Sequence, residues 1–277
     1  MSLSVNTNIS AIDAYNNLNA TSNNMQSAIS ELSSGLQIQT AADNASGYVI
    51  AQGLNVQANG LGVAINNGQS AISVLQIAEG AMNQQVSILQ RMNELATQAA
   101  NAGTANSSSL AADQQEFAAL QNQLDQIAQS TQFGQTALLN GSYQSESFQI
   151  GAYAASADQV VVSIATMTSS AMGVSTSAVS IGTSSAAISA MSAVQSAISY
   201  VASAEAVVGA TQNQIQAIIA NDTVSQQNVQ SAYSTMVDAN VAQAMTKFSS
   251  DQVLMQSGIA MLSQAQSLPQ LLLKLIP

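Results

Sequence analysis

The sequence contains no histidine, no cysteine and no tryptophan, and only 3 of its 277 residues are lysine or arginine. Without imidazole and thiolate side chains, it lacks the commonest general base, the most reactive nucleophile and the side chains that usually bind zinc. The carboxylates are spread singly along the chain, and no EF-hand loop or glycine-rich phosphate loop is present. We therefore expect no catalytic residue, no cofactor and no metal site, in a protein that is not an enzyme.

The few cations bear on possible partners. Arg91, Lys247 and Lys274 are isolated in a chain of net charge -11, whereas nucleic-acid binding needs clusters of basic residues. No stretch of about 18 strongly apolar residues is free of polar interruption, so we expect no membrane insertion. The first twenty residues lack the cationic start and the apolar block of a secretory signal, so we expect any export to use another route, without a cleaved signal peptide.

Charged residues make up 6% of the chain, against roughly a quarter in ordinary globular proteins. Glutamine, asparagine, serine and threonine provide the polarity instead, and their hydrogen bonds do not depend on pH. Salt bridges, by contrast, are lost once carboxylates protonate at about pH 4. Two interpretations stay open: adaptation to an acidic external medium, or compositional drift.

Both ends of the chain carry the same apolar rhythm, with steps of three and four residues that are typical of helices packed on helices. The stripe near the start runs through Ala11, Tyr15, Leu18, Ser22, Met25, Ile29, Leu32 and Leu36, and the stripe near the end through Val241, Met245, Phe248, Gln252, Met255, Ile259, Leu262 and Gln266. Together with Ile9 and Ile12, the large apolar members are the fourteen candidate assembly residues: Ile9, Ile12, Tyr15, Leu18, Met25, Ile29, Leu32, Leu36, Val241, Met245, Phe248, Met255, Ile259 and Leu262. Polar residues interrupt each stripe, and neither has a partner nearby in the sequence. We expect these residues to mediate self-assembly, with the ends ordering when they meet other chains.

The patterns between the stripes predict a mainly α fold: a long antiparallel helical bundle and a terminal coiled coil with a small β-hairpin region. Helices are expected over 5–36, 45–100 and 110–130, a hairpin over 148–150 and 159–164, and two more helices from 187 onward, with Asn221 and Asp222 as candidates for a break between them. Residues 166–185 are rich in serine and threonine. We expect them to form an exposed loop, whose hydroxyls are candidate sites for sugar.

Several short motifs resemble those of bacterial flagellins. Near the start these are Glu31-Leu-Ser-Ser-Gly-Leu-Gln-Ile38 and Ala42-Asp-Asn-Ala-Ser-Gly47. Ile77-Ala-Glu-Gly-Ala-Met82, Leu89-Gln-Arg-Met-Asn-Glu-Leu-Ala96 and Thr131-Gln-Phe-Gly134 follow in the family's order. Near the end, Gly209-Ala-Thr-Gln-Asn213 and Ser263-Gln-Ala-Gln-Ser-Leu-Pro-Gln270 resemble the carboxyl-terminal region of the family.

This resemblance implies a subunit that polymerises into the extracellular flagellar filament for swimming motility. The implied partners are other copies of the chain, the flagellar cap, the hook-associated junction proteins, an export chaperone and the flagellar type III secretion apparatus. Residues 1–44 and 235–277 would form the inner coiled coil, residues 45–165 and 186–234 the outer shell, and residues 166–185 a short variable surface loop. The chain would be a short form that lacks large outer domains.

The resemblance also places Arg91, Leu95 and Glu116 at positions that contact the animal innate receptor in related flagellins. The competing interpretation is a solvated or locally paired helix face. The chain departs from the family at Gln37, Ala42, Asn93 and Gln214, where flagellins usually carry a basic residue. Two alternative functions stay open: a hook-filament junction protein, and a secreted helical adhesin or toxin.

Overall fold

The computed structural model of the chain describes residues 7–101, 103 and 106–273. Five helices account for most of them: α1 (Ile9–Ser34), α2 (Ala45–Ala100), α3 (Ser107–Ser130), α4 (Ser184–Val237) and α5 (Val241–Leu273). The chain divides into a terminal unit, residues 1–56 with 228–277, and a central unit, residues 57–227. The expected boundaries at 44/45 and 234/235 concern layers of a polymer and stay a prediction.

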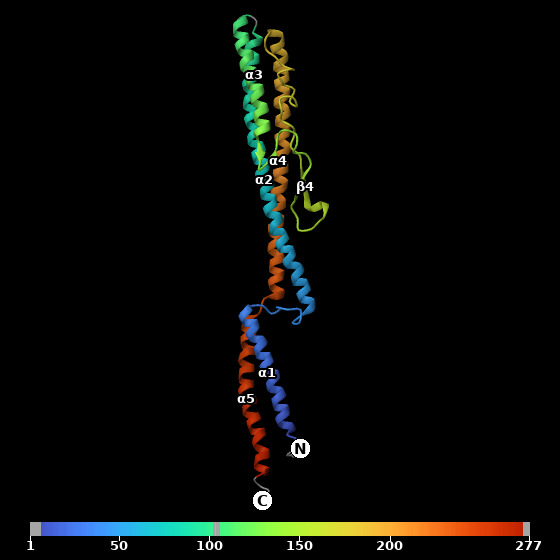
Figure 1. Ribbon diagram of the computed structural model, residues 1–277, viewed down its shortest axis with the longest axis vertical. Helices are drawn as coiled ribbons and strands as arrows, with labels where there is room; N and C mark the ends of the chain where they lie inside the picture. The colour runs from blue at the N-terminus through green and yellow to red at the C-terminus, as the bar shows by residue number, and fades with distance from the viewer. Residues whose placement is uncertain (1–6, 102, 104–105, 274–277) are drawn as a thin grey trace. The chain divides into compact units, whose positions relative to one another are not determined.

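In the terminal unit, α1 and α5 lie side by side and run antiparallel (Figure 1). Their direction follows from their contacts, because Asn8 meets Ala265 while Leu36 pairs with Asp238 in an isolated β-bridge. The two stripes, more than two hundred residues apart in sequence, therefore belong to helices that are each other's partners within one chain. The predicted coiled-coil pairing of the terminal helices is confirmed.

In the central unit, α2, α3 and α4 surround one apolar core, which contains Leu75, Met82, Leu89, Phe117 and Val194. The bounds predicted for α2, and the end predicted for α3 at residue 130, are confirmed. Asn106 caps α3, since its side chain accepts a hydrogen bond from Ser109 N at 2.7 Å while Ser109 Oγ accepts from Asn106 N. The break expected at Asn221 and Asp222 is wrong, because α4 continues to Val237.

Two small antiparallel sheets lie between α3 and α4 in sequence. The predicted hairpin is confirmed as β3 (Glu146–Gln149) paired with β4 (Gln159–Val162). A second sheet, β1 (Gln132–Phe133) with β2 (Thr136–Ala137), was not predicted, because two-residue strands carry no alternating pattern. Gly134 adopts a φ of 63° between these strands, a conformation that glycine tolerates best.

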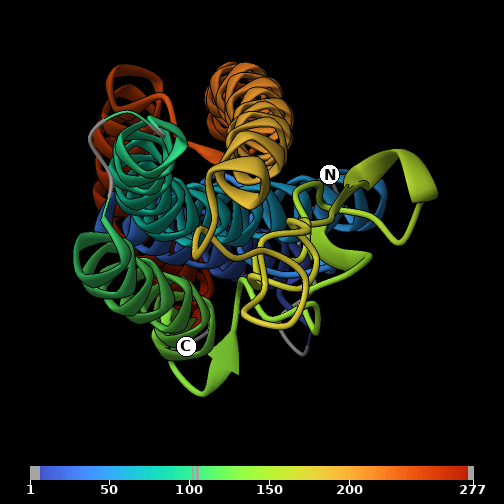
Figure 2. The same cartoon turned by 90° about the horizontal axis from the view of Figure 1, so that it is seen from above.

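The segment 166–185 is irregular, as expected, but the expectation that it is an exposed loop is wrong. Met167, Val174 and Ile181 are fully buried in the core of the central unit. Buried amides from the helices hold the segment: Gln121 Nε2 donates to the carbonyls of Val174 (2.8 Å) and Val179 (3.1 Å). Figure 2, which looks along the helices, shows the β3–β4 hairpin (yellow-green) reaching farther from them than this segment (yellow).

Candidate assembly surface

The ends of the α1–α5 pair are fixed by polar contacts within the terminal unit. Asn8 caps α1, because its Oδ1 accepts from Ala11 N at 3.0 Å, and its Nδ2 donates to the carbonyl of Ala265 at 2.7 Å. At the other end of α1, Gly35 has a φ of 72° and donates its N–H to the carbonyl of Glu31. The carbonyl of Gly35 then accepts from Ala239 N at 2.8 Å, just before α5 begins. One cap at each end of α1 thus also binds the segment that contains α5.

The contact face between the two helices, here called the seam, follows a strict three-four repeat on both sides. From Ala14 onward on α1, large side chains alternate with small ones. Leu18 packs on Gly258, where an added Cβ would lie 3.1 Å from Leu18 Cδ1. This alternation lets facing helices interdigitate closely. The covered positions are Ala11, Ala14, Leu18, Thr21, Met25, Ala28 and Leu32 on α1, and Ala244, Phe248, Asp251, Met255, Gly258, Leu262 and Ala265 on α5.

Six of the fourteen predicted assembly residues lie in this seam. On α1, the seam includes Leu18, Met25 and Leu32, while Leu36 is half-buried beyond the helix end. On α5, the seam includes Phe248, Met255 and Leu262. The remaining predicted residues of both helices are exposed: Ile9, Ile12, Tyr15, Ile29, Val241, Met245 and Ile259.

Sequence reasoning missed the small seam residues because it favoured the larger apolar side chain one position away. Ala14 lies in the seam instead of Tyr15, and Ala28 instead of Ile29. On α5, Gly258 lies there instead of Ile259. The signal that could have found them is the recurrence of small residues seven positions apart, unbroken on α1 (Ala14, Thr21, Ala28) and interrupted on α5 only by Asp251.

Because small residues fill half of the seam, each helix keeps a second set of apolar side chains that its partner does not cover. These side chains are 47–66% exposed, and they lie on both helices of the terminal unit. They are Ile9, Ile12, Tyr15 and Ile29 on α1, and Val241, Met245, Val253, Leu254, Ile259 and Met261 on α5. An exposed apolar surface of this extent is typical of a protein-protein contact.

The motif Ala42–Gly47 lies in the connection between α1 and α2, and its side chains form hydrogen bonds with the backbone there. Asp43 Oδ2 accepts from the backbone N–H groups of Thr40 (2.9 Å) and Gln39 (3.1 Å) and from Thr40 Oγ1. These hydrogen bonds, the one from Thr40 N most of all, lower the pKa of Asp43. Asn44 Oδ1 accepts from Gly47 N, and a Cβ at Gly47 would lie 2.7 Å from Ile38 Cδ1.

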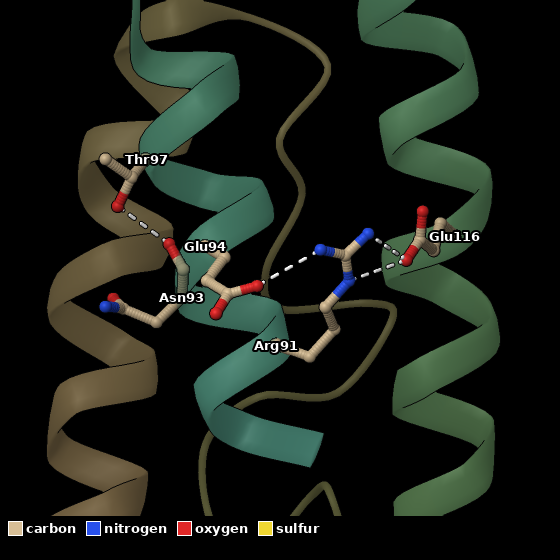
Figure 3. A network of polar contacts seen from close by, with 5 residues as sticks. All are labelled: Arg91, Asn93, Glu94, Thr97 and Glu116. Carbon is tan, nitrogen blue, oxygen red and sulfur yellow. Dashed lines mark hydrogen bonds and ion pairs between the residues drawn. The ribbon is translucent and has the colours of Figure 1, made fainter. Parts of the chain in front are cut away.

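The predicted receptor contacts lie in the central unit, where Arg91 is paired locally (Figure 3). Its guanidinium donates to Glu116 Oε1 at 2.8 and 2.9 Å and to Glu94 Oε2 at 3.1 Å, and these bonds raise the pKa of Arg91. Leu95 is only 2% exposed and belongs to the core. The three residues do not form one exposed patch, and receptor contact stays a prediction.

Asn93, one of the four departures from the family, flanks this cluster. Thr97 Oγ1 donates to its backbone carbonyl at 2.8 Å (Figure 3). Among the residues that the structure describes, no group of three or more acidic side chains is placed to hold a metal ion. Within the same ranges, no helix combines the length and the hydropathy that a bilayer crossing would need.

Comparison with known proteins gives two family matches, which residues 145–190 separate. Residues 5–144 match the bacterial flagellin N-terminal helical region, and residues 191–276 match the bacterial flagellin C-terminal helical region. Flagellin D of Vibrio anguillarum is 47% identical over 152 residues, covering 55% of this chain and 40% of that protein. Flagellin B of Vibrio cholerae is 46% identical over 175 residues, covering 62% of this chain and 46% of that protein.

The chain therefore spans less than half the length of these two curated relatives. The crystal structure of Bacillus cereus flagellin is similar at a TM-score of 0.49 and 23% identity, covering 57% of this chain and 88% of that one. The N-terminal region alone matches half of the chain, and the C-terminal region follows it in the same order. On this basis, the chain belongs to the bacterial flagellin family.

Proposed function

We propose that this protein is a structural subunit of the extracellular bacterial flagellar filament and that copies of it polymerise through their terminal helices. Family membership supports the role of a structural subunit. The two sets of apolar side chains on α1 and α5, one in the seam and one exposed, support polymerisation through these helices. The seam joins the two helices of one chain, while the side chains outside it remain for neighbouring copies. Of the fourteen residues named from the sequence, six lie in the seam and seven are exposed, while Leu36 lies beyond the end of α1.

Energetics favour a terminal unit that becomes stable only in the polymer. Its helices are long, but their seam contains small residues and one buried carboxylate, Asp251. Burying a side chain such as isoleucine contributes about 1.5–3 kcal/mol, so covering the ten exposed apolar side chains of α1 and α5 would supply a large stabilisation. Growth of a filament through one repeated contact that does not close into a ring would provide that cover.

The further partners and the localisation are part of the same proposal. They are the flagellar cap, the hook-associated junction proteins, an export chaperone and the type III secretion route to the cell exterior. The flagellin matches favour a filament subunit over the hook-filament junction protein and over the secreted adhesin or toxin. The family is structural, which supports a protein without catalytic activity.

The test is seeded polymerisation of the full chain, followed by electron microscopy. A variant with Ile29→Ser and Ile259→Ser removes two exposed apolar side chains without touching the seam. Its matched control, with Asn24→Ser and Gln256→Ser, changes exposed polar positions on the same helices. We expect fibres from the native chain and the control, and at least a tenfold loss of fibre mass from the apolar variant.

Circular dichroism of the monomers should be the same for all three proteins, which would separate loss of assembly from loss of folding. Equal fibre yield from the apolar variant would contradict the assignment of this surface. Failure of the native chain to extend seeds, together with a rigid monomer, would favour the adhesin interpretation instead.

A further inference from the structure

Carboxylates interrupt the face of α4 that packs on the rest of the central unit. Val201, Val208 and Ile215 lie on this face and are at most 2% exposed. Glu205 and Asp222 continue the same three-four repeat, four residues after Val201 and seven after Ile215. Both residues are half-buried, and an unpaired charge partly removed from water on a packed face costs free energy unless it finds a cation or takes up a proton.

Among the described residues, neither carboxylate is paired with a cation. Glu205 Oε1 and Asp222 Oδ2 are out of contact with solvent and accept no hydrogen bond within the described part of the chain. Arg91 is the single cationic side chain in the sequence of the central unit, and Glu94 and Glu116 bind it. In α2, no charged residue occurs between the start of the helix and Glu79.

The charged groups within electrostatic range of these two carboxylates are also acidic. For Glu205 the group is Glu79 on α2, whose Oε2 accepts a hydrogen bond from Gln212 Nε2 of α4 at 2.9 Å, which holds Glu79 at the helix contact. For Asp222 the group is Asp158, in the short helix η1 (Ser156–Asp158), whose Oδ2 accepts from Tyr153 N at 3.1 Å.

We propose that the α4 face of the central unit is a proton-binding device, in which Glu205 beside Glu79 and Asp222 beside Asp158 take up protons on folding. The subunit is then more stable in mildly acidic than in neutral solution. This inference concerns the central unit alone and does not depend on the proposed assembly through α1 and α5.

The sign follows from the folded-state environment. Burial, and then the charge of Glu79, raises the pKa of Glu205. Burial, and then the charge of Asp158, raises the pKa of Asp222. A carboxyl whose pKa is raised on folding stabilises the fold below its unfolded pKa, and this stabilisation is lost as the pH rises through the folded pKa. The pH range over which stability falls therefore begins near the ordinary pKa of a carboxyl group and extends to higher pH.

The direct test is a carbon-13 carboxyl titration of the full monomeric chain labelled at its six glutamates. Between about pH 4 and about pH 8, the Glu205 signal should titrate at higher pH in the folded chain than in the same chain unfolded in urea. Titration of Glu205 at the same pH in the folded and the unfolded chain would overturn the proposal, and this measurement requires no variant to fold.

A stability measurement adds the consequence for folding. The urea midpoint of the native chain should fall as the pH rises from about 5 to about 7.5, and Glu205→Gln should lose part of that fall while gaining stability at neutral pH. Glu146→Gln makes the same chemical change on an exposed side chain of β3 and controls for the reduced net charge. Equal pH dependence in the two variants would contradict the proposal. So would saturable stabilisation by millimolar calcium chloride at neutral pH, because a cation would then replace the proton.

Discussion

The closeness of α2 and α4 can be tested with two glycines of the same helix. At Gly68, an added Cβ would lie 2.8 Å from Ile219 Cγ1, 2.9 Å from Ile219 Cδ1 and 3.5 Å from Ile215 Cγ2. At Gly80, an added Cβ would meet nothing within 4 Å. Both substitutions to alanine carry the same gain in helix propensity, about 1 kcal/mol, so the difference between the variants measures the contact alone.

Overpacking a filled core costs about 1–3 kcal/mol, because Ile219 must leave its rotamer or the helices must separate. We expect Gly80→Ala to be about 1 kcal/mol more stable than the native chain, and Gly68→Ala to be about 1–3 kcal/mol less stable than Gly80→Ala. Urea unfolding of the dilute monomer, followed by circular dichroism, measures both values. Equal stability of the two variants would refute the packing of Gly68 against Ile219.

Two further predictions concern polar contacts. Gln121→Ala leaves the carbonyls of Val174 and Val179 without their buried donor, so it should lower the free energy of unfolding by about 2–4 kcal/mol and speed amide exchange in residues 172–181. The control, Gln123→Ala at an exposed position, should change stability by less than about 0.5 kcal/mol. Equal effects of the two variants would contradict the role of Gln121. Asp43→Ala should abolish the amide protection of Thr40 at neutral pH. In the native chain that protection should be present above about pH 4 and lost as the pH falls through the lowered pKa of Asp43. A protection factor of Thr40 that stays the same at acidic pH would count against this assignment.

The fold could be predicted where local signals agree. The bounds of α2 and the end of α3 follow from helical periodicity and capping residues, and the β3–β4 hairpin follows from a switch to β-branched residues. The motifs that indicated the family perform backbone roles: Gly35 ends α1, Asp43 closes a turn and Gly134 joins two strands. Such roles depend on near neighbours in the chain, so short motifs carry them.

Segment 166–185 could not be predicted in the same way, because its environment is set by distant residues. Its serines and threonines indicate a surface loop, and nothing local reveals that Gln85 and Gln121 offer amides to its carbonyls. Gln85 Nε2 donates to Met167 O at 2.9 Å and Gln121 Nε2 to Val174 O at 2.8 Å. The burial of this polar segment therefore depends on hydrogen bonds supplied by α2 and α3, which composition does not encode.

For the terminal helices, the sequence is compatible with two packing faces, and the structure shows which of them is used. A stripe of large apolar residues and a repeat of small ones run one position apart on both α1 and α5. A helix that packed through Tyr15 and Ile29 would bury its largest side chains within one chain and leave alanine and glycine outside. Packing through Ala14, Ala28 and Gly258 does the reverse, because close helix contact needs small residues. The larger side chains then remain available to neighbouring copies, which is the arrangement that a polymerising subunit requires.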